Sequence, residues 1–207
     1  MTGSMSEILS LFTTRVYRSL IGTNQGDLRD DLVDACLMLE IEDKAGRKWC
    51  RDNNYRGYTS YASLTDLPTR MTAFGNLRRL LDKHVAKFGD DVGFDLGGSR
   101  LKLDSLWVNV MPDGGVHSGH IHPNSAVSGT FYVALPDGAA RLKLEDPRLA
   151  MMMAAPVRRS DAALCLQPFV FLTPMEGEVI LWESWLRHEV VPNRSKQKRI
   201  SISFNYA

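Results

Sequence analysis

The spacing of apolar residues changes near residue 100 of this chain. Before that point apolar side chains recur every three or four positions, which predicts helices. The stretch 27–44 carries one such stripe, formed by Leu28, Leu32, Cys36 and Leu39, and the stretch 68–88 carries a second. Thr23, Asn24 and Asp27 offer side chains that could cap the first helix. The polar stretch 46–66 between the two predicts a loop.

From about residue 100 onward, short strand-like runs follow one another and are separated by turn residues. The runs are 100–111, 126–135, 140–146, 169–172, 178–184 and 199–207. Short strands at this spacing predict an antiparallel sandwich or barrel. Because the helices come first and the strands follow, the sequence predicts an α+β protein whose helices pack on one side of a β core.

Length, charge and cysteine content narrow the class of protein. The 207 residues fit a single domain, with 1–99 as helical support and 100–207 as the β core. A net charge of +1 supplies no strong basic field, so nucleic acid is not an expected partner. Three cysteines without CxxC spacing indicate a reducing compartment. No apolar run reaches about 18 residues, and a cytoplasmic protein without a membrane partner is therefore expected.

Three of the five histidines lie in the short segment HSGHIHP, at 117–123. His120 and His122 are two residues apart, so on a strand both side chains would point to one face and could share a metal ion. His117 has the opposite parity and is expected beside the site. His188, far along the chain, offers a third ligand. Two neighbouring ligands with one distant ligand leave metal positions open for chemistry.

The last predicted strand, RISISFNYA, alternates cleanly between apolar and polar residues. Arg199, Ser201, Ser203 and Asn205 share one face, and Ile200, Ile202, Phe204 and Tyr206 share the other. An arginine with a hydroxyl two residues on suits a small carboxylate. The alternative is an edge strand whose polar face meets solvent. Other candidates to line a pocket are Trp107, Asn109, Tyr132, Trp182 and Trp185, with Tyr132 the strongest for ligand contact.

These features together resemble a known group of enzymes. The HxH pair, His188 and Arg199-x-Ser201 resemble the site of the 2-oxoglutarate/Fe(II)-dependent dioxygenases. Segments 119–148 and 174–205, and LFTTRVYRSL at 11–20, resemble the bacterial and phage branch of the 2OG-Fe(II) oxygenase family. The resemblance implies a double-stranded β-helix, or jelly-roll, core with N-terminal helices packed on one sheet.

The resemblance also implies cofactors and roles. Fe(II) would be held by His120 and His188, and the far carboxylate of 2-oxoglutarate by Arg199 with help from Ser201. The implied activity is hydroxylation of a substrate, coupled to decarboxylation of 2-oxoglutarate to succinate. The substrate, a small molecule or a peptide, is left open. A homodimer is one expectation, because edge strands of such cores often pair.

His122 departs from the pattern, since Asp or Glu usually stands at its position in these enzymes. One interpretation is a three-histidine site, which imidazole chemistry allows for iron. The other is that a carboxylate from Asp113 or Asp146 completes the site. In the first case Asp146 and Arg148 are candidates for a buried ion pair or for substrate contact.

Two further functions fit parts of the pattern. A cupin-type three-histidine dioxygenase would not use 2-oxoglutarate, and the spacing of Gly114 to His120 resembles the start of a cupin motif. The glutamate expected next in that motif is absent, and Arg199 has no role there. A non-catalytic β-sandwich module with a structural metal would need a fourth ligand, for which Cys165 is the candidate.

Overall fold

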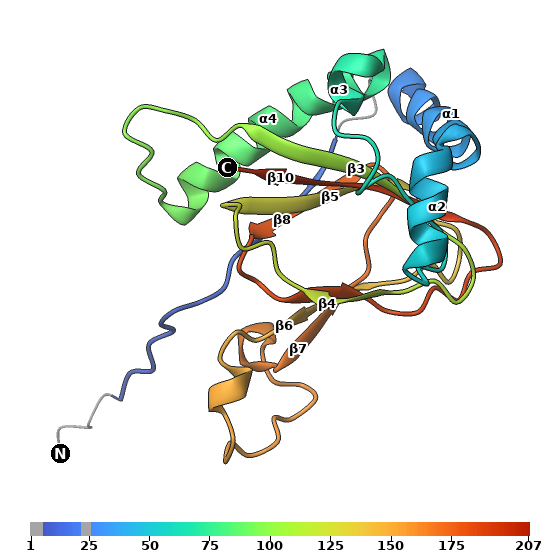
Figure 1. Ribbon diagram of the computed structural model, residues 1–207. Helices are drawn as coiled ribbons and strands as arrows, with labels where there is room; N and C mark the ends of the chain where they lie inside the picture. Colours follow the sequence, from blue (N-terminus) through green and yellow to red (C-terminus); the bar gives the residue numbers. More distant parts are fainter. Residues whose placement is uncertain (1–5, 22–25) are drawn as a thin grey trace, which may run out of the picture.

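Two antiparallel sheets face each other, and helices cover the outer side of the larger one (Figure 1). The computed structural model describes residues 6–21 and 26–207. The larger sheet has the order β1 (Val16–Leu20), β8 (Glu178–Glu183), β5 (Val127–Ala134), β10 (Arg199–Tyr206), β3 (Leu103–Met111) and β2 (Tyr58–Thr59). The smaller has the order β4 (His117–His120), β9 (His188–Val190), β6 (Leu142–Glu145) and β7 (Phe169–Leu172). The predicted α+β class with an antiparallel β core is confirmed.

The helices fall largely where the apolar stripes predict them. They are α1 (Gly26–Glu42), α2 (Lys44–Asp52), α3 (Leu67–Arg70) and α4 (Thr72–Val92), with short 3₁₀ turns at Leu149–Met151 and Leu164–Leu166. The proposed caps Thr23 and Asn24 lie outside the described residues. Asp27 falls inside α1 rather than before it. No helix of the described chain is both long enough and apolar enough to cross a membrane.

The prediction of a loop over 46–66 is wrong, because α2 and β2 occupy part of it. The α2 helix is mostly polar and buries only Gly46 and Cys50, which lie four residues apart on one face. Asp43 starts this helix, since its carboxylate accepts a hydrogen bond from the Gly46 N–H at 2.9 Å. The helix has only nine residues, fewer than the window of about 11–18 residues in which helical periodicity is read. The strands β1, β4 and β9 were also not predicted, and each is short.

The strand β10 separates the hydrophobic core from a polar interior. Ile200, Ile202 and Phe204 belong to one cluster with α1 and α4 residues such as Leu32 and Leu81. The alternate residues face the smaller sheet. Because β10 pairs with β3 on one side and β5 on the other, it lies inside the sheet. The edge-strand alternative is therefore wrong, and the polar face is enclosed.

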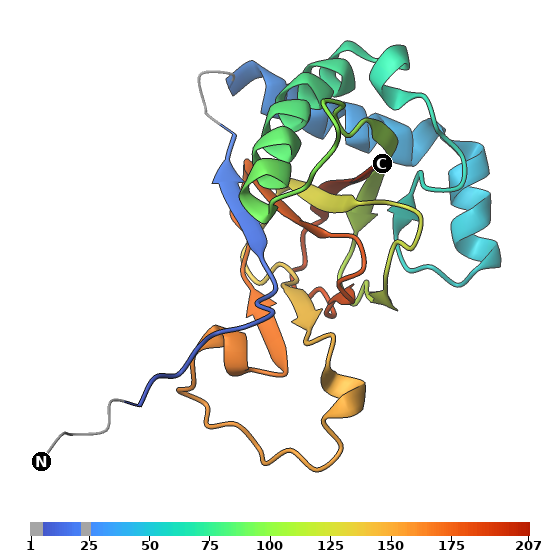
Figure 2. The same cartoon turned by 90° about the vertical axis from the view of Figure 1, so that its left-hand side faces the viewer.

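The hairpin β6–β7 and its connecting residues project from the side opposite the helices (Figure 2). This connection carries both 3₁₀ turns and several exposed apolar side chains, among them Met153 and Leu164. Cys165, the candidate fourth ligand of a structural metal site, is exposed here. Leu142 of β6 lines the space enclosed between the sheets, whereas none of the connecting residues 146–168 does so.

Gly129 of β5 is a position where a methyl group is expected to destabilise the fold. A Cβ there would lie 2.5 Å from Leu181 Cδ2 and 2.6 Å from the Phe204 ring. Overpacking of this kind costs about 1–3 kcal/mol. We expect Gly129→Ala to lower the free energy of unfolding in urea by that amount.

The matched control for Gly129→Ala is Gly89→Ala, in the buried face of α4. Its Cβ would meet only Phe94 Cδ2, at 3.7 Å, an ordinary contact. Alanine is also the better helix former, by about 0.8–1.0 kcal/mol. Gly89→Ala should therefore leave stability unchanged or raise it, and equal losses in both variants would contradict the packing argument.

Candidate active site

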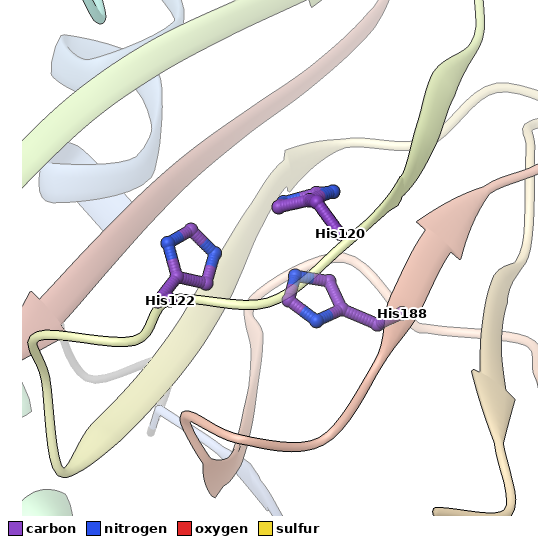
Figure 3. A group of neighbouring side chains, drawn as sticks. All are labelled: His120, His122 and His188. Carbon is purple, nitrogen blue, oxygen red and sulfur yellow. The ribbon is translucent and has the colours of Figure 1, made fainter.

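Three histidine rings converge in the space between the sheets (Figure 3). His120 ends β4, His122 follows two residues later, and His188 begins β9. His120 and His188 stand directly opposite each other across the β4–β9 pairing. One nitrogen from each of the three rings lies within 4.8 Å of the other two. Such a group of imidazole nitrogens can hold one metal ion, and imidazole suits iron.

Strand parity does not explain how His122 joins this group. The strand β4 ends at His120, so His122 lies in the loop that follows. Its backbone N–H donates a hydrogen bond to the carbonyl oxygen of Ser184 at 3.0 Å. This contact with the end of β8 brings the loop back over the site.

His117 reaches the same cavity in spite of its opposite parity. The register of β4 against β9 shifts between His117 and His120, as happens where an extra residue is inserted in a strand. The two rings stack with centroids 4.5 Å apart and an angle of 18° between their planes. His117 thus lies beside the three convergent histidines, as expected from the sequence, but through an irregular strand.

The protonation of two of these histidines follows from their hydrogen bonds. The Nδ1 atom of His120 lies 2.7 Å from the Ser118 carbonyl, and that of His188 lies 2.9 Å from the Leu186 carbonyl. A carbonyl oxygen only accepts, so each Nδ1 carries the hydrogen and each Nε2 keeps a free lone pair. Fixing the ring in this way is typical of metal-binding histidines.

Burial keeps these imidazoles neutral, which is the form that binds metal. Burial, with a smaller contribution from the nearby His120, lowers the pKa of His188 to about 3. The same two causes lower the pKa of His122 and of His117 to about 4. Near neutral pH the cluster therefore presents lone pairs rather than positive charges.

The cavity continues from the histidines to Arg199, whose side chain is fully buried at the start of β10. Its Nη1 donates to Ser201 Oγ at 2.9 Å, and its Nε donates to the Ala140 carbonyl at 3.3 Å. The guanidinium also lies over the Tyr132 ring, 5.2 Å from the centroid. Within 6–21 and 26–207, no carboxylate forms an ion pair with it.

A buried cation without an acidic partner is unfavourable by itself, because water no longer solvates it. Burial accordingly lowers the pKa of Arg199, although a guanidinium stays charged in proteins. Burial likewise raises the pKa of Tyr132 to about 12. This end of the cavity is therefore suited to an anion, and Tyr132 remains a neutral donor beside it.

Several buried polar atoms of the cavity wall have no hydrogen-bond partner in the described chain. They are Asn109 Oδ1, Tyr132 Oη, Trp107 Nε1 and Trp182 Nε1. The residues lining the cavity include no aspartate or glutamate. Buried polar groups are normally satisfied, so these atoms mark positions where a bound ligand would find hydrogen bonds. Trp185, also a sequence candidate, is 43% exposed and does not line the cavity.

The two candidate carboxylates do not join the histidines. Asp113 is exposed in the turn between β3 and β4, and neither it nor Asp146 lines the cavity. Asp146 instead pairs with Arg148, with Nη2 and Oδ2 2.8 Å apart. Arg148 is about half exposed, so this is not a fully buried ion pair. Cys165 does not line the cavity either.

Some residues of the site received no individual role from the sequence, although Ser203 and Asn205 were placed on the polar face of the last strand. Thr130 and Ser203 line the cavity, and Asn205 touches His122. The signal for them is the two-residue alternation of β5 and β10, which places them on the same face as Tyr132 and Arg199.

A histidine cluster that could hold a metal ion therefore shares one cavity with a buried arginine between two antiparallel sheets. Residues 105–205 match the family model described as "Putative 2OG-Fe(II) oxygenase". This match agrees with the resemblance to that family seen in the sequence. None of the curated proteins matches the chain.

Solved structures of low sequence identity share the fold. The α-ketoglutarate-dependent epimerase SnoN from nogalamycin biosynthesis is 12% identical, with a TM-score of 0.63, over 94% of this chain and 78% of that one. A prolyl-4-hydroxylase from Pseudomonas putida is 15% identical, with a TM-score of 0.59, over 94% and 92%. A 2OG-Fe(II) oxygenase family oxidoreductase from Burkholderia pseudomallei is 19% identical, with a TM-score of 0.48, over 66% and 58%. The first two show the double-stranded β-helix fold with N-terminal helices.

Proposed function

We propose that this protein is a 2-oxoglutarate- and Fe(II)-dependent oxygenase that hydroxylates its substrate. The observation that carries the proposal is the buried Arg199, which has no acidic partner among the described residues and shares one cavity with three convergent histidines. The family match over residues 105–205 supports the same cofactors. SnoN, which has this fold, has been solved in complex with Fe³⁺ and α-ketoglutarate.

His120, His122 and His188 would hold the metal. The residues present fit it, because their nitrogens converge and two of the rings are already fixed by backbone carbonyls. Iron with 2-oxoglutarate and O₂ supplies an oxygen atom for a C–H bond, while 2-oxoglutarate becomes succinate and CO₂. Three neutral ligands leave the ion one positive charge higher than a set with a carboxylate.

Arg199, Ser201 and Tyr132 would hold the far carboxylate of 2-oxoglutarate. Arg199 has N–H groups left after its bonds to Ser201 and Ala140, and a guanidinium matches a carboxylate with two parallel hydrogen bonds. The Tyr132 hydroxyl, buried without a partner, is a further donor. These side chains orient the co-substrate along the cavity toward the histidines.

Two tryptophans shield the histidines from water. The Trp182 ring lies 4.7 Å from that of His188, and the Trp107 ring lies 5.8 Å from that of His122. Excluding water strengthens polar interactions inside the site and limits side reactions. The loop after β4 and the turn before β9 carry the exposed side chains of Ile121 and Trp185, each next to a histidine of the cluster in sequence or separated from it by two residues.

Anaerobic protein with Fe(II) should develop a weak visible charge-transfer band when 2-oxoglutarate is added. The band requires the co-substrate to bind the metal directly, which a cupin-type three-histidine site would not arrange. Protein loaded with Zn(II) is the control, because zinc cannot give this band. Absence of the band together with absence of 2-oxoglutarate binding by calorimetry would falsify the proposal. Succinate release coupled to gain of one oxygen by a substrate tests the hydroxylation itself.

A further inference from the structure

His122 is held differently from the other two convergent histidines. His120 and His188 each face a backbone carbonyl through Nδ1. His122 Nδ1 instead faces the side-chain carboxamide of Asn205, with Nδ2 of that amide 3.3 Å away. In Figure 3 the other ring nitrogen of His122 points toward His120 and His188. The side chain of Asn205 therefore occupies, at the Nδ1 atom of His122, the position that a backbone carbonyl oxygen occupies at the other two rings.

A carboxamide can present either of its ends to the ring. If the NH₂ group faces His122, it donates to the Nδ1 lone pair, and the neutral ring then carries its hydrogen on Nε2. If the oxygen faces His122, it accepts the hydrogen of Nδ1, and Nε2 keeps its lone pair. Only the second arrangement lets the neutral imidazole bind a metal through the nitrogen that points into the cluster.

The other neighbours of Asn205 permit both orientations. Its Oδ1 lies 2.8 Å from Ser128 Oγ, and its Nδ2 lies 3.1 Å from Ser105 Oγ. A hydroxyl both donates and accepts, so a half-turn of the amide leaves every one of these hydrogen bonds satisfiable. Asn205 can thus present either its amide oxygen or its NH₂ group to His122 without leaving a buried polar group unpaired.

The same network also fixes the backbone of His122. Ser128 Oγ lies 2.8 Å from Ser184 Oγ, and the Ser184 carbonyl accepts the His122 N–H at 3.0 Å. The ring and the backbone of His122, a residue outside any strand, are therefore tied to one row of polar residues on β5, on β10 and just after β8. Asn205 is 6% exposed, so water does not readily replace it.

We propose that Asn205 is the positioning residue that makes His122 a metal ligand, by turning its amide oxygen to the His122 Nδ1–H. The proposal rests on the proposed function, because it takes the three histidines as the metal ligands. It assigns to β10 a second task besides carrying Arg199. It also gives His122 the kind of acceptor that the carbonyls of Ser118 and Leu186 give the other two rings.

The test uses the full chain loaded with Co(II), a paramagnetic probe that shifts the ring N–H protons of bound histidines far from all others in a proton NMR spectrum. Wild-type protein should show three such exchangeable signals. Asn205→Leu should lose one of them, because the His122 N–H has no acceptor, and should bind Co(II) about 10–100-fold more weakly. Asn205→Asp keeps an acceptor oxygen and should retain three signals.

Tyr206→Phe is the matched control. Tyr206 is the next residue of β10 and points to the other face, and its replacement by Phe removes a partly buried hydrogen bond to Asp82 of 2.7 Å. It should keep three signals and wild-type Co(II) affinity, which separates positioning of His122 from general loss of stability. Three signals and unchanged affinity in folded Asn205→Leu would overturn the inference while leaving the proposed function intact. Failure of wild-type protein to bind Co(II) would overturn both.

Discussion

Replacing His188 with alanine is expected to abolish iron binding. His188 supplies one of the three convergent nitrogens found within 6–21 and 26–207, and it is the one that comes from β9 rather than from the β4 segment. Changes to residues that merely support a ligand already weaken metal binding about 10–100-fold. Loss of the ligand itself should therefore weaken iron binding by more than about 100-fold, measured as iron retained per chain after gel filtration.

The control for His188→Ala is His84→Ala. The His84 ring is also partly buried and makes one hydrogen bond, between its Nδ1 and Tyr17 Oη at 2.9 Å, but it lies on α4 outside the cavity. It should keep the full iron content. His188→Gln serves as a second variant, should alanine leave the protein unable to fold. A folded His188 variant that retains iron would show that the three histidines are not the ligands.

Replacing Arg199 with leucine is expected to remove 2-oxoglutarate binding and to spare the metal. A charged hydrogen-bonded contact is worth about 1.5–3 kcal/mol, which corresponds to about 10–150-fold in affinity, and the paired contact of a guanidinium lies at the upper end. Calorimetry with Fe(II)-loaded protein under anaerobic conditions measures this affinity, and metal analysis checks that iron remains.

The thermal stability of Arg199→Leu is a second measurement, and it should not fall even though the affinity for 2-oxoglutarate falls. In the protein without co-substrate the buried guanidinium lacks a carboxylate partner within the described chain, and an apolar side chain avoids that desolvation. The variant should melt at an equal or higher temperature than wild type. Arg187→Gln, at an exposed arginine beside His188, should leave 2-oxoglutarate affinity unchanged. Unchanged affinity in Arg199→Leu would contradict the assigned role.

The sequence predicts those helices and strands whose regularly spaced apolar residues are also the residues that are buried in the core. The stripe through Leu32 and Cys36 and the alternation of Ile200 and Ile202 each pack one face on the core, so their periods report their structures. The helix α2 was not predicted because its nine residues are fewer than the window of about 11–18 residues in which helical periodicity is read.

The site was predictable as a set of residue types but not as a geometry. His120, His188 and Arg199 could be named from spacing and from resemblance. The position of His122, however, depends on a loop held by the Ser184 carbonyl, and that of His117 depends on an irregular strand. Contacts between residues more than 60 positions apart, such as that of His122 with Asn205, leave no local pattern in the sequence.

The central place of β10 has a consequence for how this enzyme can diversify. The eight residues of this strand line the cavity with one face and pack in the hydrophobic core with the other. Few of these side chains can therefore change without harm to folding or to cofactor binding. Substitutions should be better tolerated in the segment around Ile121 and in the turn around Trp185, because both side chains are exposed. New substrates should therefore be acquired through these two loops, on a strand framework that stays constant.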